Sequence, residues 1–278
     1  MDEKFVLVTG AAKGIGQATT LHLAKAGFVV FAGVRKVEDG EALRRENPSI
    51  RPLLIDVTDA QQIAEAAAIV RDQVTGNGLY GLVNNAGIAV AAPLEFLPIE
   101  DFRTQMEVNL VGQLAVTQAF LPCIRQARGR IINVSSIGGR IAGPLMGAYH
   151  ASKFALEGLS DSLRMQLAPW GIEVVVIEPG AIATPIWETG TQTADNLIAR
   201  MNPQTQALYG KQIAGGRVWA EQSAKNGAPA DQVAQVIEKA LTVPRPHTRY
   251  TVGRDALIGS RLIARLPDRL RDRLMSGR

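Results

Sequence analysis

The chain has 278 residues, of which 46% are hydrophobic, and its formal net charge at pH 7 is +4. That length suffices for one large α/β domain or two small ones. The modest charge, an aromatic content of 5% and the lack of a reading motif argue against nucleic acid as a partner. The single cysteine, Cys123, excludes an intrachain disulfide and is typical of a reducing compartment, so we expect a cytoplasmic protein. Three scattered histidines predict no metal site.

The first predicted unit is a strand, a glycine-rich turn and a helix. The apolar run of residues 4–8 predicts a buried parallel strand, which leads into TGAAKGIG at residues 9–16. An amphipathic helix of roughly residues 17–26 follows, closed by Gly27, and residues 29–32 are a second strand. Glycines let the backbone approach a ligand, and free N–H groups at a helix start face an anion. This unit therefore predicts a phosphate or pyrophosphate site.

Two cations, Arg35 and Lys36, follow the second strand. In dinucleotide folds a carboxylate at this place binds the ribose hydroxyls and selects NAD, whereas an arginine accommodates the 2′-phosphate of NADP. No acid occurs before Glu38, and Lys13 in the glycine turn could reach the same phosphate. We therefore predict NADP(H) rather than NAD(H) as the cofactor. The alternative is that these are ordinary solvated loop charges.

Two further strand ends carry polar residues. The strand expected over residues 53–57 contains Asp56, which either accepts from an adenine amine or caps the helix of residues 60–74. The sequence GLVNNAG at residues 81–87 is another apolar strand end followed by two amides and a glycine. Asn side chains can hold a turn and bridge strands, while Gly87 leaves room for a cofactor sugar. Both places are thus candidate parts of a cofactor site.

Tyr149 and Lys153 lie four residues apart, which on a helix places both side chains on one face. A phenol titrates near pH ~10, and a neighbouring cation lowers its pKa by favouring the phenolate. A shift of about three units takes roughly 4 kcal/mol, more than one lysine supplies at a wet site. We therefore expect a cationic cofactor or a dry pocket to contribute. Upstream, the strand of residues 130–134 leads to Ser136, whose hydroxyl could hydrogen-bond a substrate carbonyl oxygen as that oxygen gains charge.

Taken in order over roughly residues 4–185, these motifs resemble those of the short-chain dehydrogenase/reductase family. The matching parts are TGxxxGIG at 9–16, NNAG at 84–87, Asn109, Ser136, Tyr149-xxx-Lys153 and PGAIAT at 179–184. The stretches 79–188 and 249–253 also resemble the retinol and hydroxysteroid dehydrogenase branch. Strands alternate with helical patterns without a linker, which predicts one domain over residues 1–278. The resemblance implies an α/β fold: a Rossmann-type doubly wound parallel sheet with helices on both faces.

The resemblance also implies roles for the matched residues. Tyr149 would be the general acid in reduction and the general base in oxidation, Lys153 would lower its pKa and bind the nicotinamide ribose, and Ser136 would polarise the carbonyl. Asn109, in a helix expected over roughly residues 102–121, would hold a water that relays protons to Lys153. With the residues argued above, the expected cofactor-binding set is Gly10, Lys13, Gly14, Ile15, Gly16, Arg35, Asp56, Val57, Asn85, Ala86, Gly87, Tyr149, Lys153, Pro179, Gly180, Ile182 and Thr184.

Residues 185–228, here called the lid, lie outside the shared core and mix apolar and aromatic side chains with Gly, Gln, Thr and Asn. An insertion after the sixth strand of this fold would cover the cofactor and shape the substrate pocket. Its apolar content favours a hydrophobic alcohol or carbonyl, such as a steroid, a retinoid or another lipid-like compound. The alternative is that these residues pack against the body as those of any lid must.

The C-terminal tail, about residues 254–278, is basic. From residue 245 to the end there are nine Arg and three Asp, and leucines and isoleucines recur every three or four residues. This pattern predicts an amphipathic helix interrupted at Pro267, and such helices can lie on membrane surfaces. We favour a helix packed on its own domain or on a partner subunit. No apolar run approaches the ~20 residues that span a bilayer, and no signal peptide is visible.

Two other functions stay open. A 3-oxoacyl-thioester reductase acting on a carrier-bound chain is an alternative, although the apolar lid argues against it. An NADP-binding sensor without turnover would have lost the Tyr/Lys pair or the serine, whereas all four catalytic positions are present. Family members usually associate through the two long helices, here about residues 102–122 and 150–168. We therefore expect a homodimer or a homotetramer.

Overall fold

A computed structural model describes residues 3–276 of the chain. Its central sheet has seven strands: β1 (Phe5–Thr9), β2 (Val29–Val34), β3 (Ile50–Leu54), β4 (Gly81–Asn84), β5 (Arg130–Val134), β6 (Glu173–Pro179) and β9 (Arg249–Val252). All neighbours in this sheet are parallel, and the order is β3-β2-β1-β4-β5-β6-β9. The strand order reverses between β1 and β4, and in such sheets ligands bind outside the carboxyl ends of the strands at that point.

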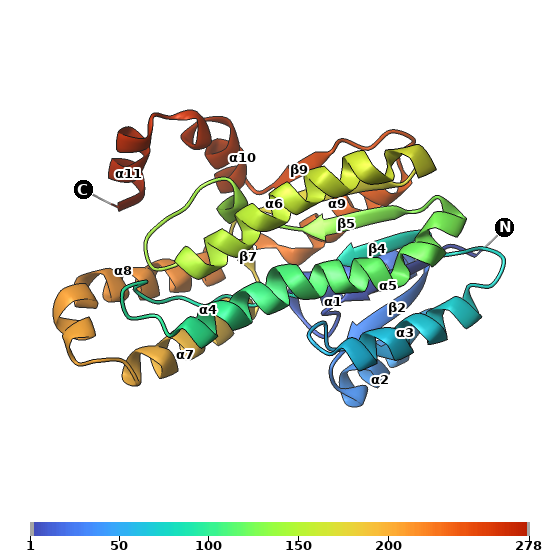
Figure 1. Cartoon of the computed structure of the whole chain (residues 1–278), viewed down its shortest axis with the longest axis horizontal. Helices are drawn as coiled ribbons and strands as arrows, with labels where there is room; N and C mark the ends of the chain where they lie inside the picture. Colours follow the sequence, from blue (N-terminus) through green and yellow to red (C-terminus); the bar gives the residue numbers. More distant parts are fainter. Residues whose placement is uncertain (1–2, 277–278) are drawn as a thin grey trace.

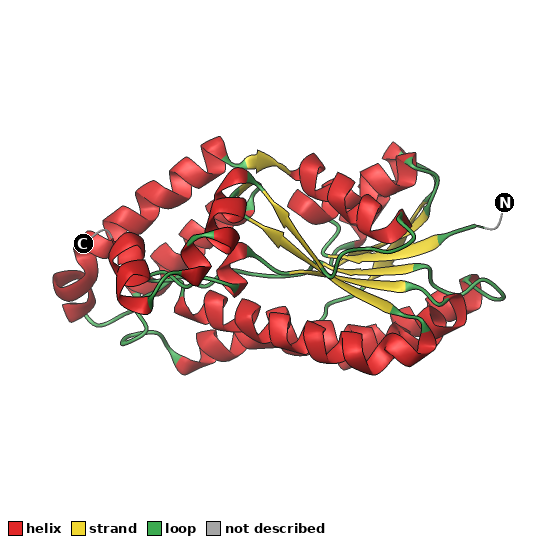
Figure 2. Cartoon of the chain, turned by 90° about the horizontal axis from the view of Figure 1, so that it is seen from above, coloured by secondary structure: helices red, strands yellow, loops and turns green. Residues whose placement is uncertain are grey.

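Helices cover both faces of the sheet (Figures 1 and 2). They are α1 (Gly14–Lys25), α2 (Val37–Glu46), α3 (Ala60–Gln73), α4 (Ile99–Met106), α5 (Gly112–Ala127), α6 (Gly147–Leu167) and α9 (Ala230–Thr242). Strand β1 illustrates why two layers are needed. Val6 and Val8 pack under α1 and α9, whereas Phe5 and Leu7 pack under α3 and α5. Burying side chains of this size stabilises the fold by about 1.5–3 kcal/mol each, and the predicted doubly wound fold is confirmed.

Strand β3 differs from its expected position. The prediction of residues 53–57 is wrong by three residues, because the strand pairs Ile50 with Val30 and Leu54 with Val34. Pro52 lies in its middle, and a proline is tolerated there because β3 is at the edge of the sheet, where no further strand needs its missing N–H. Asp56 consequently lies in the loop beyond the strand.

The helix expected over residues 102–121 is longer and irregular. It runs from α4 through a π-helical turn (Glu107–Val111) into α5. Pro122 does not end it: the helix continues to Ala127, with Phe120 and Ile124 fully buried on either side of the proline. Burial of these side chains outweighs the backbone hydrogen bond that a proline removes.

The lid forms two helices, α7 (Ile186–Ala199) and α8 (Gln204–Asn226). Its two ends are joined by a short parallel pair, β7 (Ile182–Ala183) and β8 (Ala228–Pro229). Within it, the rings of Trp187 and Trp219 meet edge to face at 5.0 Å. Arg217 and Asp195 form an ion pair of 2.6 Å between the helices. The lid is therefore a helical hairpin with its own internal contacts.

The tail contains α10 (Arg254–Arg261), a 3₁₀ turn (Ile263–Arg265) and α11 (Asp268–Ser276), so the predicted interruption before Asp268 is present. The tail packs on the domain most closely at α10, where Ala256 and Gly259 are buried, and Leu274 and Met275 of α11 line the cavity described below. Leu262 and Leu270 are exposed, and Figure 1 places α11 at the periphery of the molecule. Within residues 3–276, each helix is too short or too polar to cross a bilayer.

Candidate active site

A cavity of about 2550 Å³ lies at the carboxyl ends of the strands. It is walled by the β1–α1 turn, by the loops after β2, β4, β5 and β6, and by the two helices of the lid. Every residue predicted for the site lines this cavity except Gly16 and Asn109. Motifs that are far apart in the sequence are thus brought to one place by the parallel sheet.

The glycine turn has the shape that a bound pyrophosphate requires. Gly10 and Gly14 have φ angles of 64° and 60°, which side chains other than glycine rarely adopt. A Cβ at Gly16 would collide with the carbonyl oxygen of Gly10 and with the amide of Asn85, so only glycine lets α1 begin this close. Lys13 at the N-cap makes no side-chain hydrogen bond to α1, which leaves the first N–H groups of the helix free for an anion.

The two asparagines after β4 hold the sheet edge together. Asn85 Nδ2 donates to the carbonyl oxygen of Thr9 at 2.9 Å, and the N–H groups of Asn85 and Ala86 donate to Thr9 Oγ1. Asn84 Nδ2 donates to Asn133 Oδ1 on β5 and to Thr117 Oγ1, each at 2.9 Å. The expected bridging role is therefore seen, and Asn85 contributes to the cavity mainly by fixing its wall.

Charges of both signs gather where β2 ends. Lys13, Arg35 and Lys36 are exposed, line the cavity and form no ion pair with another described residue. Asp39, in the first turn of α2, lines the same cavity. Asp56, after the neighbouring strand β3, is a second lining acid. Three cations and two acids leave an excess of positive charge, which suits an additional phosphate.

Asp56 does not cap the helix after β3. Its Oδ1 accepts from the N–H and the hydroxyl of Thr58, at 2.9 and 2.7 Å. The cap of α3 is Asp59, whose Oδ1 accepts from the N–H groups of Gln61 and Gln62. The capping alternative for Asp56 is therefore wrong, and both Asp56 and Val57 remain as lining residues of the cavity.

The polar residues of β5 and α6 meet on the other side of the glycine turn. Ser136 Oγ accepts from the N–H of Gly138 at 3.0 Å and lies next to the Tyr149 phenol. Lys153 is 5% exposed, its Nζ donates to the carbonyl oxygen of Val134 at 2.8 Å, and that Nζ lies 5.9 Å from the centre of the Tyr149 ring. Tyr149 and Lys153 lie one turn apart at the start of α6, as their spacing predicts.

Burial shifts the pKa values of these two groups in opposite directions. It raises the pKa of Tyr149 above its ordinary value, an effect that the Ser136 hydroxyl opposes. It lowers the pKa of Lys153 to about 8, which the carboxylate of Glu157 opposes. The expectation that a dry pocket helps to form the phenolate is therefore wrong for the protein alone, because burial penalises the charged form.

Asn109 lies in the π-helical turn and is fully buried. Its Oδ1 accepts from the N–H of Ile88 at 2.9 Å, and its Nδ2 donates to Ile88 O and to Ser152 Oγ. The side-chain amide is thus occupied by protein partners and is not placed against Lys153. The expected water-binding role of this amide has no support in the geometry, because its oxygen and nitrogen both have protein partners.

The stretch after β6 is fixed by the tail and the lid. Gly180 N–H donates to Val252 O, and the N–H of Ala181 donates to Asp255 Oδ2 at 2.7 Å. Ile182 O accepts from Trp187 Nε1 at 2.7 Å. Pro179, Gly180, Ile182 and Thr184 all line the cavity.

The sequence model of the short chain dehydrogenase family matches residues 4–195. The chain belongs to the short-chain dehydrogenase family. It is similar to retinol dehydrogenase 5 of Mus musculus, with 37% identity over 281 residues that cover 99% of this chain and 88% of that protein. It is also similar to 3-amino-tetrahydro-pyrrolizinone reductase of Xenorhabdus hominickii, with 38% identity over 92% of this chain and 89% of that protein.

A solved short chain dehydrogenase from Burkholderia cenocepacia J2315, in complex with NADP, superposes with a TM-score of 0.76. The two are 28% identical, over 99% of this chain and 98% of that one. The predicted family and its retinol/hydroxysteroid dehydrogenase-like branch are confirmed. This short-chain dehydrogenase is an oxidoreductase of alcohols and carbonyls.

Sequence reasoning missed several lining residues of this short-chain dehydrogenase. Asp39 had a local signal, since it opens the helix after β2. Asp255 had none, because it lies 74 residues from its partner Ala181. His150 lines the cavity although it follows Tyr149, and its Nδ1 donates to Gly138 O at 3.0 Å. No group of acidic, His or Cys side chains within residues 3–276 could hold a metal ion.

Proposed function

We propose that this enzyme is an NADP(H)-dependent oxidoreductase that interconverts a lipophilic alcohol and its carbonyl by proton transfer through Tyr149. The observation that carries the proposal is that Ser136, Tyr149 and Lys153 line one cavity whose other wall is the lid. The cofactor, when bound, supplies or accepts the hydride. The glycine turn, with its open helix N-terminus, would hold the pyrophosphate.

The three side chains have complementary tasks. Because the pKa of Tyr149 is raised, its phenol is protonated at neutral pH and can donate to a carbonyl oxygen during reduction. Ser136 Oγ accepts from Gly138, which leaves its own proton for a hydrogen bond to that oxygen. In oxidation the phenolate must form, and the Lys153 ammonium stabilises it. Val134 takes one of the three Nζ protons, so the others are available to ribose hydroxyls.

NADP(H) is favoured by the charge at the end of β2. A 2′-phosphate would lie near Arg35, Lys36 and Lys13, with Asp39 and Asp56 as the nearby acids that line the cavity. Asp39 could instead accept from ribose hydroxyls, as acids at this place do in NAD enzymes. The ratio of kcat/KM for NADPH to that for NADH tests the preference directly, and a ratio below one would contradict it.

A lipophilic substrate is supported by the lining of the lid. Its apolar lining side chains include Ile186, Trp187, Ile198, Leu208, Ile213 and Trp219. Lys211 and Gln212 also line the cavity, so one polar end of a substrate can be accommodated. Apolar walls with a few polar groups are typical of sites for small hydrophobic ligands.

The decisive experiment follows NADPH oxidation at 340 nm with steroid, retinoid, long-chain and small polar carbonyls. One lipophilic class should be turned over, and Tyr149→Phe should lower kcat by about 10²–10⁴-fold with the Kd for NADPH unchanged. Turnover of a carrier-bound 3-oxoacyl thioester instead would support that alternative. Tight NADPH binding without turnover of any carbonyl would favour the sensor.

We also propose that the enzyme forms a homo-oligomer through α5 and α6. Phe154 and Met165 on α6 and Val111 at the start of α5 are exposed apolar side chains on these two helices. Sedimentation velocity should give a dimer or tetramer, and Phe154→Asp should dissociate it. A monomeric wild-type protein at micromolar concentration would contradict the proposal.

A further inference from the structure

The active-site lysine has a buried acidic neighbour. Glu157 lies one helical turn after Lys153 on α6, and the two residues are 6% and 5% exposed. Residues at this spacing share a helix face, with about 5–6 Å between their Cβ atoms. Both lie beside the end of β5, where Lys153 donates to Val134 O. A buried carboxylate at this distance stabilises the ammonium more than an exposed one would.

Arg249 holds one oxygen of the Glu157 carboxylate, because its Nε donates to Oε2 at 3.0 Å. The other oxygen, Oε1, and the hydroxyl of Ser135 are both buried, and neither has a hydrogen-bond partner among the described residues. A Cβ at Gly139 would lie 2.9 Å from Ser135 Oγ and 3.1 Å from Glu157 Cγ, so this glycine lets the serine and the glutamate lie close together. The carboxylate is therefore oriented by β9 and lies beside the end of β5.

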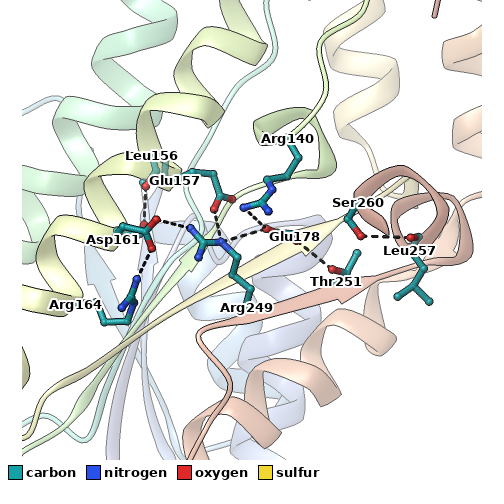
Figure 3. A network of polar contacts seen from close by, with 11 residues as sticks. Arg140, Leu156, Glu157, Asp161, Arg164, Glu178, Arg249, Thr251, Leu257 and Ser260 are labelled. Carbon is teal, nitrogen blue, oxygen red and sulfur yellow. Dashed lines mark hydrogen bonds and ion pairs between the residues drawn. The ribbon is translucent and has the colours of Figure 1, made fainter. Parts of the chain in front are cut away.

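Arg249 joins a cluster that reaches the edge strand β9 (Figure 3). It donates to Asp161 Oδ2 at 2.9 Å and lies 3.5 Å from Glu178 Oε1, which Arg140 approaches to 3.7 Å. The pKa of Glu157 is raised above its ordinary value, mainly by burial and also by Glu178, although the Ser135 hydroxyl and Arg249 lower it. Without Arg249, two buried carboxylates would face each other without their shared cation.

We propose that Glu157 is a positioning residue for Lys153, because its carboxylate, hydrogen-bonded by Arg249 of β9, holds the buried ammonium in its charged form. The inference rests on the proposed catalytic role of Lys153. Charged or titratable groups around the pair are Tyr149 on α6, Glu178 on β6 and Arg249 on β9.

The consequence is a defined pH dependence. Burial lowers the pKa of Lys153 to about 8, and Glu157 opposes that shift, so loss of the carboxylate lowers the value further. A neighbouring opposite charge favours the charged form of a group, so its loss shifts the pKa of the ammonium downward. Above the new value Lys153 is neutral, and it no longer stabilises the Tyr149 phenolate. The alkaline limb of the activity profile therefore moves to lower pH.

Glu157→Gln tests this, with Asp161→Asn as the matched control. Both variants lose a carboxylate partner of Arg249, but Asp161 lies two turns from Lys153 and is partly exposed. Glu157→Gln should move the alkaline limb of kcat/KM down by about one unit or more, and Asp161→Asn should leave it in place. Equal losses of Tm in both variants with unchanged pH profiles would mean a purely structural role and overturn the proposal.

A second readout does not depend on turnover. The pH dependence of Lys153 acetylation by acetic anhydride, followed by mass spectrometry on the cofactor-free protein, reports the pKa of Lys153 itself. Glu157→Gln should be labelled at lower pH than the wild type, and Glu157→Asp, which keeps the charge, should lie between them. If Glu157→Gln does not fold, Glu157→Asp alone carries the test, and a wild-type labelling profile there contradicts the proposal. Labelling as expected without turnover of any carbonyl would overturn the proposed function and retain the charge coupling.

Discussion

The cofactor half of the cavity and its substrate half are built by different means. The first consists of strand ends, glycines with fixed φ angles and short polar side chains such as Thr9 and Asn85 that bond to the backbone. The second consists of the lid and the tail, where large side chains such as Trp187 and Trp219 pack against each other. Backbone geometry tolerates few substitutions, whereas a helical hairpin tolerates many. We therefore expect most substitutions in the cofactor half to impair the protein, whereas the substrate half should tolerate many.

The largest expected difference is between two glycines. Gly16→Ala places a methyl group against Gly10 O and the Asn85 amide, so we expect NADPH affinity to fall at least 10-fold and stability to fall by about 1–3 kcal/mol. Gly215→Ala, within α8, meets nothing within 4 Å, so stability should rise by about 0.5–1 kcal/mol. Fluorescence titration measures the affinity for NADPH, and urea unfolding measures the stability of each variant. Similar changes of NADPH affinity and stability in the two variants would mean that the two halves of the cavity do not differ in their tolerance to substitution.

A smaller effect is expected at the adenosine end. Arg35→Gln removes a charge-assisted hydrogen bond to a 2′-phosphate, worth about 1.5–3 kcal/mol, and should lower the NADPH preference about 10- to 150-fold. Arg44→Gln on α2 is the control, since Arg44 pairs with Glu41 and does not line the cavity. The ratio of kcat/KM for the two cofactors decides. An unchanged ratio in Arg35→Gln would mean that Arg35 is a solvated loop charge that does not bind the cofactor.

In the substrate half, Leu208→Gln should raise KM for a lipophilic carbonyl about 5- to 30-fold, as expected from loss of about 1–2 kcal/mol of apolar contact. Leu208 lines the cavity and is exposed, so stability should not change. Ile258→Gln on α10 is the control because Ile258 is exposed outside the cavity. Equal KM values in both variants would exclude the lid from substrate binding.

The smallest effect concerns the tail, for which contact with an anionic bilayer surface is the alternative to the packed helix that we favour. Leu262 and Leu270 are exposed beside the arginines of α10 and α11, a pattern that suits anionic headgroups. If the tail binds such a surface, full-length protein should co-sediment with vesicles rich in phosphatidylserine and not with neutral vesicles. Leu262→Ser combined with Leu270→Ser should weaken this binding a few-fold. Binding that is equal for both vesicle types would discard the idea.

The structural features that the sequence predicts depend on interactions between residues that are close together in the chain. Apolar runs predict the five strands β1 to β5, although β3 is misplaced because pairing at the sheet edge, not hydropathy, sets its register. The π-helical turn around Asn109 has no signal in the sequence, and the partners of the Asn109 side chain, Ile88 and Ser152, lie 21 and 43 residues away along the chain. The helix expected to end near residue 121 continues through Pro122 to Ala127, because the burial that outweighs the proline is a tertiary effect.

The sequence by itself determined the sheet, the glycine turn and the Tyr149–Lys153 pair, because each depends on a few consecutive residues and a fixed period. Only the tertiary structure decided the signs of the pKa shifts, since these depend on burial. It also decided the partners of the site residues that come from far along the chain, such as Asp255 for Ala181 and Arg249 for Glu157. The partners in these contacts are 74 and 92 residues apart in the sequence. No local sequence pattern indicates that residues so far apart come together, because only the fold brings them into contact.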